Sequence, residues 1–386
     1  MPGANKNSKW TDALLDRMRK QADPLADGPV AKVLDRGDVD AVNDLMHTLV
    51  RVDQLPPEQL PPELREYLEQ SLPLPEWADT AKIKQGQQIF EEWGFLIILC
   101  LFCASLPASY AAANGVKVLH TTARLVTDAR RRVMETGQFL MDVLAVGGLD
   151  DESKGRRAIQ KVRLMHAAVR HLIEARNERT PGMWHSEWGR PINQEDLAGS
   201  LLTFSYVVAQ PLPRLGVHLS ADQVEAYLHL WNVIGHLEGV SDELLAHDVS
   251  DVTELVDTIR RRQFRASPEG QELTRALMDL LDEVTPLHQF DETIPPLIRH
   301  LIGDQTADML LVPKSHLGAL VRAADWGIEH VFGEVERDLV HDQFMSDMAR
   351  PLAGHVVRGM FALERGGERA PFAIPDHLAG RWDLPA

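Results

Sequence analysis

Apolar residues recur every three to four positions over most of the chain, which is the spacing of amphipathic helices. No stretch alternates apolar and polar residues over more than a few positions, so the pattern predicts no β-sheet. From residue 80 onward the spacing predicts helices over residues 80–104, 107–119, 121–145, 156–177, 193–210, 220–238, 251–264 and 268–284. Two of these helices begin with typical caps, Asn193 in one and Ser220 with Gln223 in the other. The predicted fold class is all-α, a large helical bundle.

The first 79 residues hold shorter helical pieces between proline-rich turns. Here the pattern predicts helices over Trp10–Gln21, Asp38–Val50 and Glu63–Gln70. We expect residues 1–79 to form a cap packed on a core of residues 80–290, with C-terminal helices and an irregular tail over residues 291–386. Because no linker divides these parts, the prediction is one structural domain overall, although 386 residues is long for one.

The composition, 44% hydrophobic and 25% charged residues, is that of a soluble globular protein. A formal net charge of −17 disfavours binding to nucleic acid and to anionic membranes. The uncharged run Gly94–Ala113 is about as long as a membrane span, but Pro107 and nearby polar residues interrupt it. We therefore expect a buried core helix that ends near Pro107, and no stable membrane insertion.

The chain starts without the apolar segment of a signal peptide, and two cysteines cannot build a disulfide framework. Both features favour a cytoplasmic protein. Cys100 and Cys103 form a CxxC spacing within the most apolar run, where plain core cysteines are favoured over a redox or zinc pair. His229 and His236 lie seven apart, and a histidine at a helix C-terminus is favoured over a metal site because no third ligand is evident.

Two predicted helices carry polar groups in the middle of an apolar face. In Thr121–Ala145 these groups are Arg132 and Thr136, and in Arg156–Arg176 the group is His166. Such groups are costly to bury without partners. A lone histidine on an apolar face is usually a core residue that has found a hydrogen bond. However, Arg170 lies one turn after His166 and disfavours a charged imidazole, and a neutral imidazole in an apolar slot suits the proximal ligand of haem iron.

Several segments, in their order and spacing, resemble the MpaB/rubber-oxygenase family, which includes the latex-clearing proteins. The segments that carry this resemblance are Ser105–Tyr110, Arg132–Thr136, Met165–Arg170, Pro191–Asp196, Trp231–Gly239 and the tail with Pro375 and Trp382. The resemblance covers most of the chain. It implies an all-α fold with a globin-like helical core around one haem b.

The resemblance also implies roles for single residues. His166 matches the proximal iron ligand of the family, and Arg132 and Thr136 match its distal Arg-x-x-x-Thr pair. We expect Arg170 to pair with a haem propionate. Glu135 stands where the latex-clearing enzymes have a lysine, and it becomes a candidate base for an allylic proton, although an exposed helix carboxylate fits it equally well. Because of this difference, we expect cleavage of rubber polymer to be absent or poor.

The leading hypothesis is a haem b-dependent oxygenase that uses dioxygen on a small hydrophobic substrate, such as an isoprenoid-type alkene. Arg132 and Thr136 would donate hydrogen bonds to oxygen or to a substrate oxyanion. Two alternatives stay open at this point: a haem-binding or gas-sensing protein without turnover, and a haem-free helical scaffold of the same family. The sequence predicts neither the substrate itself nor the oligomeric state.

Overall fold

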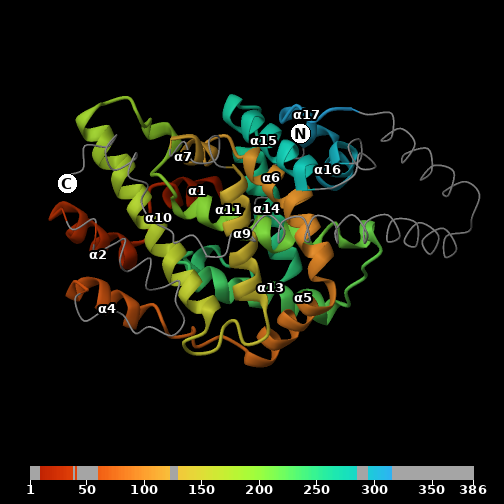
Figure 1. Cartoon of the computed structure of the whole chain (residues 1–386), viewed down its shortest axis with the longest axis horizontal. Coiled ribbons are helices and arrows are strands. Elements are labelled where there is room, and N and C mark those ends of the chain that lie inside the picture. The colour runs from red at the N-terminus through yellow and green to blue at the C-terminus, as the bar shows by residue number, and fades with distance from the viewer. Residues whose placement is uncertain (1–8, 38–39, 41–59, 122–128, 285–293, 315–386) are drawn as a thin grey trace, which may run out of the picture.

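The computed structural model describes residues 9–37, 40, 60–121, 129–284 and 294–314. Within these residues the regular structure is helical and contains no β-strand, which confirms the all-α prediction (Figure 1). In chain order the α-helices are α1 (Asp12–Met18), α2 (Pro24–Asp35), α4 (Pro62–Gln70), α5 (Thr80–Cys100), α6 (Leu106–Tyr110), α7 (Val116–Thr121), α9 (Ala129–Leu144), α10 (Lys154–Arg179), α11 (Gln194–Phe204), α12 (Tyr206–Ala209), α13 (Ala221–Leu237), α14 (Val249–Gln263), α15 (Pro268–Val284), α16 (Ile294–Ile302) and α17 (Asp304–Met309).

The two predicted caps are present. The side chain of Asn193 accepts a hydrogen bond from the backbone N–H of Asp196 at 3.0 Å, and Ser220 and Gln223 form a reciprocal capping box. The single helix predicted over residues 193–210 is instead split at Ser205, whose hydroxyl bonds back to the carbonyl of Leu201 at 2.9 Å. Such back-bonding competes with regular helix geometry. The helix predicted over Asp38–Val50 lies almost wholly outside the described residues.

The core is built around α5 and its continuation. A π-helical turn, Leu101–Ser105, joins α5 to α6, so that one helical rod runs from Thr80 to Tyr110. Residues 96–105 of this rod are all buried, with α13 packed along α5 and α16 against the π-turn. Cys100 and Cys103 lie here, fully buried, and burial raises the pKa of both thiols, that of Cys103 to about 12. They are free core cysteines.

The buried core helix expected here is present, but it runs through Pro107 and ends three residues later, at Tyr110. Proline lacks the N–H that an α-helix interior needs, but here Pro107 is the second residue of α6 and lies two residues after the end of the π-turn. In that turn the N–H of Leu106 bonds to the carbonyl of Leu101, five residues back. The wider turn absorbs the proline without breaking the rod, as π-turns inside helices do.

The N-terminal helices pack on the body. Trp10, just before α1, is 1% exposed and donates a hydrogen bond from Nε1 to the carbonyl of Asp251 at 3.1 Å. α2 packs against α10, and α4 packs against α2 (Figure 1). The first turn of α2 is tied to α10 by two ion pairs, Asp23–Arg163 and Asp27–Arg170. The N-terminal segment therefore covers one side of α10.

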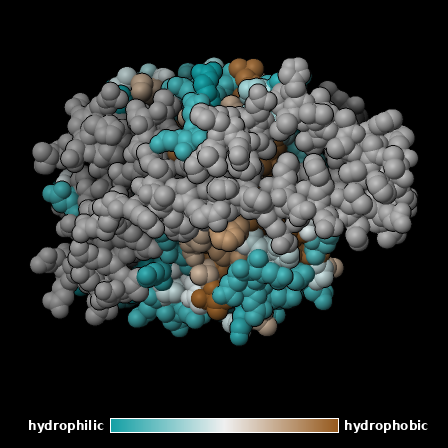
Figure 2. All heavy atoms as spheres, turned by 45° about the vertical axis from the view of Figure 1, so that its right-hand side comes forward, coloured by the Kyte–Doolittle hydropathy of each residue, from teal (hydrophilic) through white to brown (hydrophobic). Residues whose placement is uncertain are grey.

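The helix before α10 in the chain, α9, also packs against it, and the two form a helical hairpin. Residues 145–153 connect the two helices, so they run in opposite directions (Figure 1). Figure 2 shows one face of the molecule, on which the coloured residues are mostly hydrophilic and apolar residues show in a narrow band. Among the described residues, the large apolar side chains that are strongly exposed are Phe95, Val146, Met183, Val249 and Leu311.

Candidate haem pocket and neighbouring polar pocket

The apolar stripe of α10 that carries His166 is buried at both ends and partly open in its middle. Ile159 and Ile173, at the two ends, are 1% and 3% exposed. Val162, His166 and Val169, between them, are only half-buried. Apolar side chains are normally buried in a close-packed core, so the half-burial of these residues leaves part of an apolar surface exposed around one imidazole.

The facing helix α9 shows the same change along its length. Leu140 and Val143, towards its C-terminal end, are 2% and 0% exposed. Thr136 and Phe139, one turn earlier, are half-buried. Arg132 lies one further turn back within α9, and its side chain is outside the described part of the structure. The uncovered middle of α10 and the half-buried turn of α9 therefore belong to the same hairpin.

The register of the hairpin brings Arg132 and His166 to the same level. Arg132 lies twelve residues before the end of α9 at Leu144, and His166 lies twelve residues after the start of α10 at Lys154. In an antiparallel pair, positions equally far from the connection lie side by side, here roughly 18 Å from it at about 1.5 Å per residue. Thr136 lies one turn nearer the connection, level with Val162.

The residues present fit a haem. An imidazole on one helix, beside apolar side chains that are only half-buried, is the kind of group that haem iron requires on its proximal side. An arginine and a threonine on the facing helix are hydrogen-bond donors for the opposite side. Glu135 is half-buried on α9 and points about 100° away from Thr136 around the helix axis, so it borders this face without being central to it.

Arg170 differs from its prediction. Its side chain is 1% exposed, and its guanidinium donates to the carboxylate of Asp27 and to the carbonyls of Pro191 and Ile192 at 2.9 and 2.8 Å. Burial raises the pKa of Asp27, and the charge of Arg170 opposes that rise. Because the guanidinium binds protein groups on three sides, Arg170 joins α10 to α2 and to residues 191–192. We therefore no longer assign it to a haem propionate.

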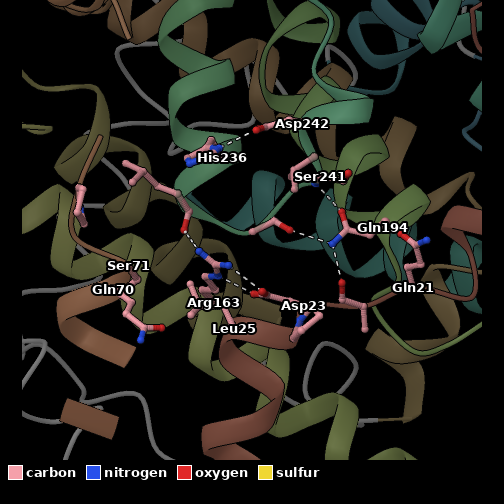
Figure 3. Close-up of a pocket in the computed structure, with 16 residues that line it drawn as sticks. Gln21, Asp23, Leu25, Gln70, Ser71, Arg163, Gln194, His236, Ser241 and Asp242 are labelled. Carbon is pink, nitrogen blue, oxygen red and sulfur yellow. Dashed lines mark hydrogen bonds and ion pairs between the residues drawn. The ribbon is translucent and has the colours of Figure 1, made fainter. Parts of the chain in front are cut away.

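A polar pocket of about 380 Å³ lies beside this helix, at the junction of the N-terminal segment with α10 and the end of α13 (Figure 3). Arg163 crosses it and binds both carboxylate oxygens of Asp23, at 2.6 and 2.7 Å, and the carbonyl of Leu237 at 3.1 Å. Gln194 bridges the carbonyls of Ala22 and Gly239 at 2.8 and 2.9 Å. These groups satisfy one another, so the pocket is a polar seam that holds the N-terminal segment in place.

Sequence reasoning missed Arg163 and Asp23. The signal was present, because Arg163 lies one turn before His166 on the same helix and a buried arginine needs a carboxylate. The partner at position 23 is far away in sequence, and only the packing of α2 on α10 identifies it. Nearby, burial raises the pKa of Glu238 to about 7, and Arg163 opposes the rise.

Two histidines of α13, and a third that precedes α14, contact one aromatic ring. His229, His236 and His247 each contact Trp77 edge-to-face, with ring centres 5.7, 5.9 and 5.3 Å apart. His236 also bonds to Asp242 at 2.8 Å. In the described part of the chain, no three histidine, cysteine or carboxylate side chains are grouped as a metal ion would need.

Comparison with known proteins identifies a family, a relative and a solved structure that this chain resembles. Residues 87–330 match the family described as ER-bound oxygenase mpaB/B'/rubber oxygenase, catalytic domain. A rubber oxygenase from Streptomyces sp. (strain K30) is 29% identical over 321 residues, which cover 81% of this chain and 76% of that protein. The structure of latex clearing protein LCP in the closed state shares the fold, with a TM-score of 0.76 and 24% identity over 93% of this chain and 95% of that one.

The family match spans well over half of the chain, includes both helices of the hairpin and agrees with the resemblance seen in the sequence. The chain therefore belongs to the mpaB/rubber-oxygenase family, and it is an oxygenase.

Proposed function

We propose that this oxygenase depends on haem b and acts on a small hydrophobic alkene of the isoprenoid class. Its relative is named for rubber, but Glu135 differs from the lysine of the latex-clearing enzymes, and we therefore expect little or no cleavage of rubber polymer here. The observation that carries the proposal is the half-buried His166, in the uncovered middle of an apolar stripe and level with Arg132 of the facing helix. An apolar face that is left open inside a hairpin suits a flat, apolar cofactor and an apolar substrate.

Each residue of the hairpin then has a task. His166 would hold the haem iron through one ring nitrogen. A bound haem supplies the iron at which dioxygen is activated. Arg132 and Thr136 donate hydrogen bonds on the other side, where negative charge develops on oxygen during the reaction. Among the carboxylates of α9, Glu135 lies nearest in sequence to Arg132 and Thr136. It is the candidate acceptor of an allylic proton.

Oxidative cleavage is the outcome that balances without a further reactant. Both atoms of dioxygen are transferred, one to each carbon of the broken double bond, and the products are two carbonyl compounds. Insertion of a single oxygen atom would need an external reductant. The apolar side chains Val162, Val169 and Phe139 contribute no proton donors, so the polar chemistry is confined to the residues of the Arg132–Thr136 segment and His166.

The first test is the iron ligand. His166→Ala should fold and keep its helix content but lose stoichiometric haem, because the imidazole supplies the bond to iron. The measurements are the Soret band and a pyridine haemochrome assay on purified protein. His171→Ala is the matched control, since His171 lies on the same helix and pairs with Asp35 at 3.2 Å instead. An unchanged Soret band in the His166 variant would refute the assignment.

The second test is the substrate. Purified protein that contains haem should consume dioxygen with isoprenoid alkenes and release carbonyl products, detected by trapping with a hydrazine reagent. Polyisoprene emulsion, short isoprenoids and their hydrogenated analogues form the panel, the last as the control without a double bond. Consumption of dioxygen without carbonyl products, or none with any alkene, would contradict the proposed reaction.

A further inference from the structure

Two arginines flank His166 on α10 and attach this helix to one short piece of the N-terminal segment. Arg163 binds Asp23, the residue before α2, and Arg170 binds Asp27 in the first turn of α2. At about 100° per residue, both arginines lie roughly 40–60° from His166 around the helix axis, on the same side of it. The two attachments therefore hold the helix on either side of the histidine along its length.

The pair between Arg163 and Asp23 has a defined geometry. Nε and Nη2 of Arg163 donate to the two carboxylate oxygens of Asp23 at 2.6 and 2.7 Å, and Nη1 donates to the carbonyl of Leu237 at 3.1 Å (Figure 3). Both charged side chains are buried. A bidentate pair of this kind fixes the direction of the guanidinium as well as its distance.

Apolar packing sets the rotation of α10 less sharply. Leu164, Ala168 and Leu172 are buried in one apolar cluster with residues of α2 and α4, and they lie roughly 120–160° from His166 around the axis. Hydrophobic contacts are non-directional, so they hold α10 against its neighbours without fixing how it is turned. The ion pairs supply that missing direction.

The end of α13 leaves room for the pair between Arg163 and Asp23. Gly239 has a φ of +87°, and a Cβ added to it would overlap Oδ2 of Asp23 and lie 2.7 Å from Nε of Arg163. A side chain at this position would therefore push the carboxylate and the guanidinium apart. Gln194 of α11 holds the N-terminal segment from another side, because its amide donates to the carbonyl of Ala22 at 2.8 Å. The pair is thus fixed to the body of the protein.

The second attachment is also rigid. Besides Asp27, Arg170 binds the carbonyls of Pro191 and Ile192 at 2.9 and 2.8 Å, and it is 1% exposed. The φ of Ile192 is +51°, in the left-handed region that a β-branched residue rarely adopts. Such a conformation persists only where the surrounding contacts enforce it. Arg170 therefore binds a piece of backbone that has little freedom to move.

We propose that Arg163 is a positioning residue that orients His166 towards the haem iron, with Asp23 as its anchor and Arg170 as the second fixed point. Arg163 acts through the helix, because the rotation of α10 decides where the imidazole three residues later points. Groups that orient a metal ligand typically contribute roughly 10–100-fold to affinity. The inference rests on the haem of the function proposed above.

The first variant disturbs the pair without changing any charge. Gly239→Ala places a methyl group against Asp23 and Arg163. Gly303→Ala is the matched control, because Gly303 also has a positive φ, +81°, but a Cβ there meets nothing within 4 Å. Both variants strain the backbone, and only the first displaces the pair.

The second variant weakens the pair without changing its size. Asp23→Asn removes the negative charge that Arg163 binds. Asp35→Asn is the matched control, because Asp35 also joins α2 to α10 through His171, at 3.2 Å, with its side chain 69% exposed. This variant decides the question if Gly239→Ala does not fold.

Three quantities are measured on wild type and the four variants. They are the rate at which ferric haem transfers to an excess of apomyoglobin, the iron–imidazole stretching band in the Raman spectrum of the ferrous protein, and the unfolding temperature. For Gly239→Ala and Asp23→Asn we expect haem to leave roughly tenfold faster or more, and the band to shift or broaden, because the imidazole is no longer held in one direction. Both controls should keep the wild-type rate and band.

The outcomes separate positioning from stability and from the proposed function. A lower unfolding temperature with an unchanged band and release rate would show that the pair only stabilises the fold, and the inference about Arg163 would be wrong while the proposed function stands. Equal changes in the controls would also overturn it, since backbone strain or any contact between α2 and α10 would then be the cause. If wild type binds no haem, the proposed function fails, and the inference fails with it.

Discussion

Two arginines of α10 lie on one side of the helix, and two valines lie on another. Arg163 and Arg170 lie on one side of His166, and their guanidinium groups bind Asp23 and Asp27 of the N-terminal segment. Val162 and Val169 lie on the other side, where the side chains are apolar and half-buried. His166 thus stands between a side that is joined by ion pairs and a side that is left apolar.

The two proposed hydrogen-bond donors of α9, Arg132 and Thr136, can be tested by substitution. Arg132→Ala and Thr136→Val should retain haem but lower turnover, each by roughly 10²–10³-fold if it removes a donor to developing negative charge. The measurements are the haem content per chain and kcat for dioxygen consumption. Arg157→Ala, on α10, is the control for loss of an arginine elsewhere in the hairpin. Haem loss as complete as in His166→Ala would place these residues in the folding core instead.

The direction in which the Glu135 side chain points can be tested by the absorption spectrum of the ferric haem protein. Glu135→Lys introduces the residue type that the latex-clearing enzymes carry there. If the side chain faces the pocket, the ferric spectrum should shift from a high-spin or water-bound form towards a nitrogen-ligated low-spin form. Glu178→Lys, an exposed position of α10, is the control. An unchanged spectrum would show that position 135 faces away from the iron and that the base lies elsewhere.

At the level of elements, a buried carboxyl group at the junction of α13 with α10 makes the free energy of unfolding depend on pH. Glu238 follows α13, and its pKa is about 7 in the folded protein against 4.5 for an ordinary glutamate, with burial as the main cause. Between these two values the folded state binds more protons than the unfolded state. The free energy of unfolding should therefore fall as pH rises from about 4.5 to about 7 and then level off.

Glu238→Gln should reduce this fall, because the amide resembles the neutral carboxyl and does not titrate. Urea unfolding at about pH 5 and about pH 8 measures the difference between wild type and variant. Glu178→Gln makes the same change at an exposed site and should keep the wild-type pH dependence. Equal pH dependence in wild type and Glu238→Gln would contradict the assignment.

At the level of the whole molecule, the rod from Thr80 to Tyr110 is the one described helix that is long and apolar enough to cross a membrane. Residues 96–105 are instead enclosed by α13, α16 and other core helices. Exposing them to lipid would require the core to come apart. We therefore predict that the native protein appears in the soluble fraction of lysed cells, as a cytoplasmic protein would. Recovery only after detergent treatment would overturn this prediction.

The sequence by itself determined the helical class and most helix boundaries, because periodicity and caps are local properties. Its motifs also indicated the family. It did not indicate that the helix continues through Pro107 to Tyr110, since the π-turn that precedes the proline depends on the packing around it. Only the tertiary structure decided what Arg170 binds, because its partners at positions 27, 191 and 192 are brought together by the docking of α2 and the loop before α11. The strained φ of Ile192 depends on those same contacts, and no local pattern encodes it.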